Sequence, residues 1–409
     1  MHDRRRAGSG AGKHRHQGWR MVAALAVTQT IGYGVLYYAF SVFLGPMTRD
    51  LRASGTQVAG ALTLAVLTTA LCAPAVGRWL DARGGRGLMT AGSVLGTAAV
   101  LGWSQVHDLF QLYAVFLGVG VASAMVLYEP AFAVIVTWFD GPAQGRGRAN
   151  ALLAVTIVAG FASAVFLPLS GLLVERYGWR QALVILGAGY GAAAIPLHAL
   201  VLRRPGHHAA QAAATARGDV LREAVRARPF RLLATAFTAH SGAVATFAVL
   251  LVTYLVHAGH SPVVASTVAG LLGVLSVTGR VVTTALRRRR SAASVAAAVF
   301  AVQGAGALLL PVVAAHAAGA IACVLLFGIG FGVGTITLPH LLAERYGTAA
   351  YAGLSGRIAL FAVAGKALAP LAAVALAQAA GYGRVMGAVA AACGAAALAL
   401  LAYHRHRLP

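Results

Sequence analysis

Three charged residues lie inside long apolar runs of this sequence. Glu129, Arg280 and Lys366 are each flanked on both sides by stretches rich in Ala, Val, Leu and Gly. If these runs cross a lipid bilayer, each charge costs at least about 2.5–3.5 kcal/mol. Charges at such positions usually act on a substrate or an ion, so these three residues are the first candidates for function.

Lys366 is the leading candidate for a substrate contact. The chain has only one other lysine, Lys13. Lys366 lies nine residues past Arg357, which places it about 13 Å deeper along a helix. A compact ammonium at this depth can bind one oxygen of a carboxylate and can change its protonation state. The alternative is a structural cation that is satisfied by carbonyl oxygens at helix ends.

Arg280 and Glu129 each allow two interpretations. Arg280 precedes the arginine run 287–290 by seven residues, about 10 Å, so it can contact substrate or extend its side chain to the aqueous boundary. Glu129 lies eleven residues before Asp140, about 16 Å from that end of its run. Burial favours the neutral form of a carboxyl group, so Glu129 can load and release a proton. It can equally serve as a charge partner of Arg280 or Lys366.

Uncharged polar residues supply weaker candidates. His240 and His340 can relay protons, but a hydrogen-bonded structural histidine is an equally available explanation for each. Gln29, Tyr33 and Tyr37 follow each other at i, i+4 and i+8, so on an α-helix they share one face. That face can form the wall of a binding pocket, or it can pack in the protein interior.

The sequence has no motif for catalysis or for a resident cofactor. We find no nucleophile–base pair, no metal-ligand spacing and no phosphate-binding glycine loop. The three cysteines, Cys72, Cys323 and Cys393, lie in apolar stretches and predict small buried side chains, not a disulfide framework or a zinc site. We therefore expect no enzyme, no metal and no cofactor.

Composition shows what solvent the chain needs. Of its 409 residues 59% are hydrophobic and only 11% are charged, and the mean hydropathy is +0.76. A water-soluble domain has about 25% charged residues. Such a composition predicts an integral membrane protein.

The apolar runs have the length of membrane-spanning helices, which need about 20 residues each. No strand-like alternation occurs, so an all-α chain is expected. The basic start followed by the long apolar run 21–47 is expected to be a first membrane helix and not a cleaved signal peptide. Twelve spans are predicted, at 21–45, 57–77, 87–106, 110–138, 149–174, 181–202, 232–256, 263–286, 292–314, 318–340, 355–377 and 385–403.

The net charge of +23 predicts the orientation of these spans. With a cytoplasmic N-terminus, 26 of the 33 Lys and Arg residues fall on the cytoplasmic side, where Arg280 is counted with the nearby run 287–290. Five fall outside, and Arg357 and Lys366 lie within a span. Cytoplasmic loops of membrane proteins collect cations, so both termini are expected on the cytoplasmic side of an inner membrane. The excess charge then needs no nucleic-acid partner.

The chain is expected to consist of two six-helix bundles. They are predicted at 21–202 and 232–403, between cytoplasmic tails at 1–20 and 404–409. The central cytoplasmic loop, 203–231, is expected to end in an amphipathic helix on the membrane surface.

Paired features at a constant spacing suggest that the two bundles are pseudo-symmetric repeats. Gly77 and Gly279 are 202 residues apart, and so are Pro168 and Pro370. Transporters with such repeats bind substrate near the bilayer midplane.

The segment between the second and third predicted spans carries a recognisable motif. A Gly, an Asp four residues later and then Gly and Arg around a tight turn resemble the loop signature of the major facilitator superfamily. This resemblance covers the whole chain and implies the fold of that family, with a cytoplasmic gate that breaks during transport. The motif residues are Gly77, Asp81, Arg83, Gly84 and Arg86.

Two further passages, 33–40 and 138–180, are similar to the bacterial relatives of monocarboxylate porters and oxalate–formate antiporters. This resemblance implies that Arg280 and Lys366 bind a carboxylate substrate from two different helices. The chain departs from the eukaryotic members of that branch in two places. It lacks their lysine in the first span, and Ser276 stands in place of the aspartate four residues before the arginine.

We therefore expect a secondary transporter that moves a mono- or dicarboxylate by alternating access, together with a proton or in exchange for a counter-anion. Its predicted substrate contacts are Lys366, Arg280, Tyr33, Tyr37 and Gln29, and its predicted proton-coupling residues are Glu129 and His240. We expect a monomer in the lipid bilayer. A proton-driven efflux antiporter for hydrophobic or cationic compounds and a non-transporting membrane sensor are the alternatives.

Overall fold

The structure, a computed structural model, describes residues 2–139, 145–203, 221–287, 289–348 and 350–406. Within these ranges every regular element is a helix, which confirms the predicted all-α class. Ten helical segments of the described chain are long and apolar enough to cross a membrane.

The number of twelve spans stays a prediction. One of the ten segments, 147–201, runs through two predicted spans, which a kink separates at Gly178 (φ 76°, ψ 164°). The helix Gly85–Trp103, which matches a further predicted span, is not among the ten.

The chain divides into two compact units, one of residues 1–217 with 348–356 and one of residues 218–347 with 357–409. The helices of the first unit are α1 (His2–Tyr33), η1 (Gly34–Tyr38), α2 (Ala39–Asp50), α3 (Gly55–Arg83), α4 (Gly85–Trp103), α5 (Leu109–Val126), α6 (Tyr128–Trp138), α7 (Gly145–Gly160), α8 (Ala162–Pro196) and η3 (Leu197–Val201). Those of the second unit are α10 (Arg228–His257), α11 (Pro262–Leu286), α12 (Ala292–Val313), α13 (Ala317–Gly328), α14 (Val333–Tyr346) and α16 (Tyr382–Arg405). α15 (Tyr351–Ala380) begins in the first unit and continues in the second.

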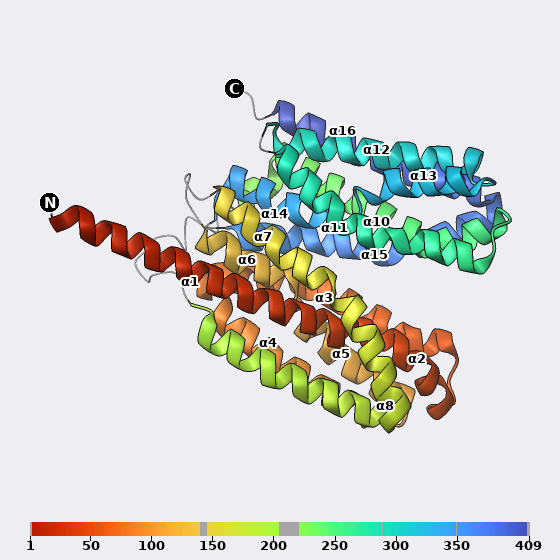
Figure 1. Ribbon diagram of the computed structural model, residues 1–409, viewed down its shortest axis with the longest axis horizontal. Helices are drawn as coiled ribbons and strands as arrows, with labels where there is room; N and C mark the ends of the chain where they lie inside the picture. Colours follow the sequence, from red (N-terminus) through yellow and green to blue (C-terminus); the bar gives the residue numbers. More distant parts are fainter. Residues whose placement is uncertain (1, 140–144, 204–220, 288, 349, 407–409) are drawn as a thin grey trace. The chain divides into compact units, whose positions relative to one another are not determined.

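Parts of the predicted domain boundaries fall outside the described residues. These parts are 204–220 of the central loop and 407–409 of the C-terminal tail. Residues 221–226 are helical, with Ala224 buried and Arg222, Glu223 and Arg226 exposed. α1 begins at His2, inside the predicted N-terminal tail, and projects beyond the other helices of its unit (Figure 1).

Aromatic side chains fill the core of the first unit. Trp103 is fully buried, and its ring lies 4.8 Å from the ring of Phe116 and 5.5 Å from that of Phe43. Phe40 packs against both Trp103 and Phe116. Because lipid is as apolar as these side chains, such close van der Waals packing is what holds membrane helices together.

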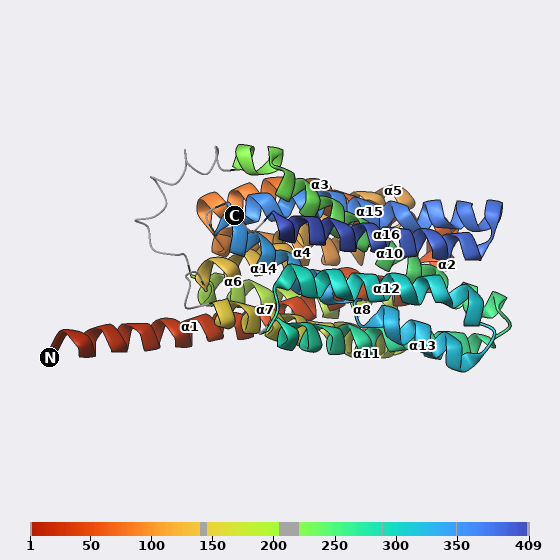
Figure 2. The ribbon, with the colours of Figure 1, turned by 90° about the horizontal axis from the view of Figure 1, so that it is seen from above.

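Small residues bring helices of the second unit close together. α12 and α16 lie side by side in both ribbon views (Figures 1 and 2). A Cβ at Gly304 of α12 would lie 3.2 Å from the backbone oxygen of Ala390 and 3.3 Å from Cys393 Cβ, both in α16. Phe247 and Phe327 stack nearby with their ring centroids 3.7 Å apart.

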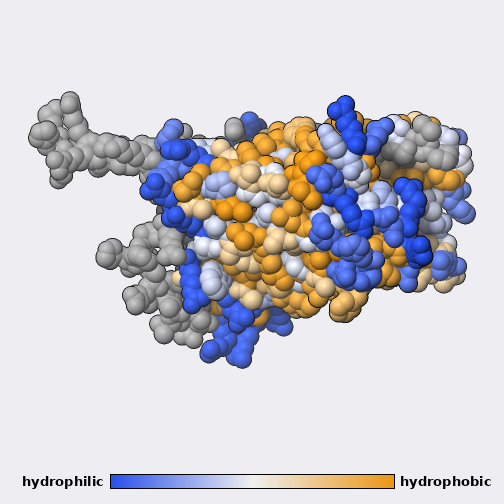
Figure 3. All heavy atoms as spheres, turned by 90° about the horizontal axis from the view of Figure 1, so that it is seen from below, coloured by the Kyte–Doolittle hydropathy of each residue, from blue (hydrophilic) through white to orange (hydrophobic). Residues whose placement is uncertain are grey.

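The surface of the molecule matches a membrane environment. On the face shown in Figure 3, hydrophobic side chains form a broad continuous area, and hydrophilic side chains gather on either side of it. Such an apolar band between polar borders is what a lipid bilayer requires.

Two of the predicted spans are broken helices. The predicted span 110–138 is interrupted at Leu127 (φ −78°, ψ −157°), between α5 and α6. The predicted span 318–340 is interrupted at residues 329–332, between α13 and α14. The two breaks begin 202 residues apart, the same spacing as the paired features of the sequence. Discontinuous helices in transporters surround the substrate, because their free backbone groups and helix ends can bind ligands.

Asp81 of the gate motif binds the start of α15, a partner that the sequence did not indicate. Its carboxylate accepts hydrogen bonds from the backbone amides of Ala352 and Gly353, at 2.9 and 2.6 Å. A carboxylate at this place satisfies free amides and complements the positive end of the helix. The interaction needs a close approach of α3, because a Cβ at Gly77 would lie 2.7 Å from the carbonyl carbon of Ala352.

The rest of the motif forms the turn between α3 and α4. Gly84 adopts φ 73°, a conformation that side chains disfavour. Arg83 stacks over the ring of Trp79 at 4.4 Å. A latch of Asp81 with Arg83 and Arg86 stays a prediction.

We predict that Asp81→Ala loosens the first turn of α15. Loss of a capping carboxylate costs about 1–2 kcal/mol, which corresponds to roughly 5- to 30-fold faster amide exchange. Hydrogen exchange of the purified full-length protein should show this increase at Ala352 and Gly353.

Asp108→Ala is the matched control. Asp108 caps α5 of the same unit by accepting a hydrogen bond from Gln111 N at 2.8 Å. Its loss should speed exchange at the start of α5 and leave α15 unchanged. Unchanged exchange at Ala352 and Gly353 in Asp81→Ala would contradict the capping role.

Candidate functional site

Glu129 lies in the first turn of α6, directly after the break at Leu127. Its side chain is half-buried, and Oε2 accepts a hydrogen bond of 2.8 Å from the hydroxyl of Ser355 in the first unit's part of α15. Ser355 is buried. The positive end of α6 favours a negatively charged carboxylate at this place.

Tyr33 borders this carboxyl group from α1. Its ring lies 4.6 Å from that of Tyr128, the residue before Glu129. One turn of π-helix, η1, follows Tyr33 directly. Such single turns often occur at functional sites.

A π-helical turn lies within the predicted face of the first span. Tyr33 directly precedes η1, and Tyr37 lies inside it. In the structure the rings of Tyr33 and Tyr38 lie 6.5 Å apart, and Tyr37 meets the edge of Tyr38 at 5.3 Å. A shared face of Gln29, Tyr33 and Tyr37 that borders a substrate stays a prediction.

Gln29 supports the break in the first unit. It is fully buried, and its side-chain amide donates a hydrogen bond of 2.6 Å to the backbone oxygen of Val126, the last residue of α5. This bond satisfies a carbonyl group at the interruption of the helix. Of the two explanations that the sequence left open, packing in the interior describes the position of Gln29.

Arg280 is buried in the second unit. Only 7% of its surface is exposed, and Nε donates a hydrogen bond of 3.2 Å to the backbone oxygen of Gly332 at the break before α14. The side chain therefore does not extend to water, which removes one of its two sequence-based interpretations. Contact with a substrate stays a prediction.

Two further buried side chains, His240 of α10 and Gln303 of α12, bind backbone groups at the same break. His240 of α10 donates from Nε2 to Gln303 Oε1 of α12 at 3.0 Å, and Gln303 Nε2 donates to the backbone oxygen of Phe327 at 2.9 Å. His240 also hydrogen-bonds the backbone of Gly330 and stacks on the ring of Phe300 at 3.8 Å. These contacts describe a hydrogen-bonded structural histidine, and its role in proton coupling stays a prediction.

The two breaks are supported in the same way. Gln29 binds the carbonyl of Val126, and Gln303 binds that of Phe327. The sequence analysis missed Gln303, although a lone amide side chain inside the apolar run 292–314 was a visible signal. Ser355 gave no such signal, because serine is common in membrane helices.

Lys366 lies on α15 beside the face that packs on α10. A Cβ at the preceding residue, Gly365, would lie 3.3 Å from Thr238, and a Cβ at Gly242 would lie 3.1 Å from Ala369. The side chain of Lys366 is exposed. Among the described residues of its own unit it has no hydrogen-bond or ion-pair partner.

Two further residues have other surroundings. His340, a candidate of the sequence, lies 3.4 Å from the Glu344 carboxylate, one turn away on α14. Arg148, which was not a candidate, precedes the predicted span 149–174 by one residue and is buried with 8% of its surface exposed.

Within the described residues, no group of three or more His, Cys, Asp or Glu side chains could hold a metal ion. Cys72, Cys323 and Cys393 are free.

Several bacterial and mammalian proteins are similar to part of this chain. An uncharacterized MFS-type transporter, YcxA, of Bacillus subtilis is 27% identical over 44% of this chain and 43% of its own length. An MFS-type efflux pump of Mycolicibacterium smegmatis is 34% identical over 42% of this chain and 38% of its own. Monocarboxylate transporter 3 of Rattus norvegicus is 32% identical over 42% of this chain and 34% of its own. In each case the chain spans less than half of the length of the relative.

Comparison of the structure extends over nearly the whole chain. The crystal structure of the E. coli fucose:proton symporter FucP matches with a TM-score of 0.73 and 16% identity, over 93% of this chain and 98% of the other. This likeness shows a common fold. The family model of the Major Facilitator Superfamily matches residues 26–370. The chain therefore belongs to the Major Facilitator Superfamily, and it is a multi-pass membrane protein.

Proposed function

We propose that this transporter moves a small organic anion, a mono- or dicarboxylate, by alternating access. Lys366 carries the proposal. It is a cation within a 30-residue apolar helix, and among the described residues of its unit it has no partner. An unpaired charge in this environment is costly, and the carboxylate of a substrate would neutralise it.

Arg280 is the second proposed substrate contact. Its guanidinium is a planar fork of five N–H donors, a geometry that matches a carboxylate, and Nε binds the backbone oxygen of Gly332. Because Arg280 binds a backbone carbonyl at a helix break, an arriving anion can compete with that carbonyl for the guanidinium. This competition would link binding of the substrate to the shape of α13 and α14.

Glu129 is the proposed coupling acid. The hydrogen bond from Ser355 joins α6 to α15, the helix that also carries Lys366. Protonation of Glu129 removes the negative charge that this hydroxyl binds, which weakens the connection. A proton on Glu129 can therefore release its contact with the start of α15. Asp81 makes a separate contact with the same part of α15. Tyr33 and Tyr37 are proposed to border the substrate, with His240 as a second proton site.

We further propose an inner-membrane monomer with both termini in the cytoplasm, as the distribution of arginines predicts. Transport with a proton and exchange for a counter-anion both remain in this proposal. The two repeats, 21–202 and 232–403, would rock around the substrate.

One observation favours a second candidate function. The chain is 34% identical over 173 residues to a protein named as an efflux pump. In that function the substrate would be a hydrophobic or cationic compound, and Lys366 would not be needed to bind it.

We predict that Lys366→Gln abolishes carboxylate uptake. The amide keeps most of the size of the side chain but cannot neutralise an anion. Liposomes that contain the wild-type protein should take up labelled lactate or oxalate, and the variant should not exceed protein-free liposomes.

Arg384→Gln is the matched control for this experiment, since Arg384 is an exposed cation near the start of α16. It should transport like the wild type. Normal uptake by Lys366→Gln would rule out the anion contact. If wild-type liposomes instead expel a labelled lipophilic cation and ignore carboxylates, the efflux function is correct.

We predict that Glu129→Gln separates transport from the proton gradient. Wild-type liposomes under an inward proton gradient should accumulate substrate above the external concentration. The variant should only equilibrate it, because a glutamine cannot carry a proton, while exchange of internal for external substrate should continue.

Two variants test the specificity of this effect. Glu175→Gln removes an exposed carboxylate of α8 and should leave accumulation intact. Ser355→Ala keeps the acid but removes its hydrogen-bond donor, so accumulation should continue at an altered rate. If Glu129→Gln still concentrates substrate, another group carries the proton.

A further inference from the structure

Three membrane helices of the second unit come together at one of their ends. α14 ends at Tyr346, α16 ends at Arg405, and α12 begins at Ala292. Tyr403 donates a hydrogen bond of 3.4 Å to the backbone oxygen of Leu341, and His404 Nδ1 lies 3.4 Å from the hydroxyl of Ser291. Because membrane helices end near the lipid headgroups, this corner of the unit lies at the membrane surface.

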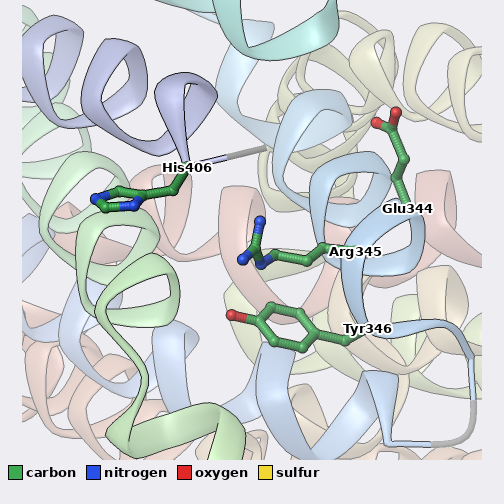
Figure 4. Close-up of a pocket in the computed structure, with 4 residues that line it drawn as sticks. All are labelled: Glu344, Arg345, Tyr346 and His406. Carbon is green, nitrogen blue, oxygen red and sulfur yellow. The ribbon is translucent and has the colours of Figure 1, made fainter. Parts of the chain in front are cut away.

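The corner contains a pocket of about 580 Å³, lined by Glu344, Arg345, Tyr346 and His406 (Figure 4). The guanidinium of Arg345 and the hydroxyl of Tyr346 extend toward the side of the pocket on which His406 lies. Glu344 points away from them. Its carboxylate lies 3.4 Å from His340 Nε2.

Aromatic rings hold Arg345 in position. The guanidinium carbon lies 5.5 Å from the ring centre of Tyr403 and 6.0 Å from that of Tyr346, within the range of cation–π attraction. An arginine that is ordered before binding loses less conformational freedom when it takes up a ligand.

The surroundings of the pocket are positively charged. Arg289 and Arg290 precede α12 and are exposed, and Arg405 is exposed in the last turn of α16. Glu344 is the carboxylate of the described lining, and it is directed to His340 and away from the Arg345 guanidinium. A basic pocket between membrane helices attracts the phosphate of an anionic lipid.

We propose that this pocket binds the headgroup of an anionic phospholipid. Arg345 presents two N–H groups to the phosphate, while Tyr346 and His406 can each donate a hydrogen bond. The acyl chains have an apolar surface beside the pocket, because Leu398 and Leu401 of α16 are 68% and 42% exposed. This apolar surface favours a lipid over a soluble phosphate. The proposal does not depend on the identity of the transported substrate.

Native mass spectrometry of the purified full-length protein tests the site, with phosphatidylglycerol and phosphatidylcholine as competing probes. The wild type should retain phosphatidylglycerol in preference. Arg345→Gln should lower this retention about fivefold, the effect of one arginine at a membrane surface. Arg384→Gln, which removes a cation from the other end of α16, should retain it like the wild type.

His406→Gln serves as a second variant at an exposed helix end, where folding does not depend on the side chain, and it should lower retention in the same direction. Equal retention by wild type, Arg345→Gln and His406→Gln would overturn the proposal. Inorganic phosphate separates the two sources of the anion. If millimolar phosphate displaces all bound phosphatidylglycerol in the wild type, the pocket takes a soluble phosphate and the lipid assignment is wrong.

Discussion

Backbone groups inside a bilayer have no water to bind, so the protein itself has to satisfy every one of them. Unbroken helices meet this demand internally. The breaks between α5 and α6 and between α13 and α14 do not, and side chains complete them. Gln29 binds the carbonyl of Val126, and Gln303 binds that of Phe327. The positions of Glu129 and Arg280 follow from these two breaks.

Each break creates helix ends inside the membrane, and helix ends attract charge. In the first unit the free start of α6 holds Glu129. In the second unit a carbonyl before α14 holds Arg280. The apolar composition leaves few other charges in these helices, so the proposed substrate and proton would have few charged groups to bind.

The composition predicted the membrane class, because 11% charged residues is far below the roughly 25% of a water-soluble domain, and the absence of strand-like alternation predicted the all-α fold. It also selected Glu129, Arg280 and Lys366, since a charge in an apolar run is visible without a structure. The breaks were not predicted. Leu127 is as apolar as its neighbours, and Gly330 and Gly332 in the second break, although glycine weakens a helix, lie in an otherwise apolar run. Because the breaks were not predicted, the binding of their carbonyl groups by Gln29 and Gln303 was not predicted either.

The partners of the charged residues depended on contacts between segments far apart in the chain. Asp81 is 271 positions from Ala352, and Glu129 is 226 positions from Ser355. From the sequence, the side chain of Arg280 could either reach water or be buried. Only its contact with the backbone of Gly332 decided between the two. The π-turn after Tyr33 likewise had no signal in the spacing of Gln29, Tyr33 and Tyr37. The sequence by itself therefore determined the solvent of this protein and which charges are costly, because both depend on residue type. The tertiary structure decided where the helices break and what each charge binds, because both depend on neighbours that no local pattern contains.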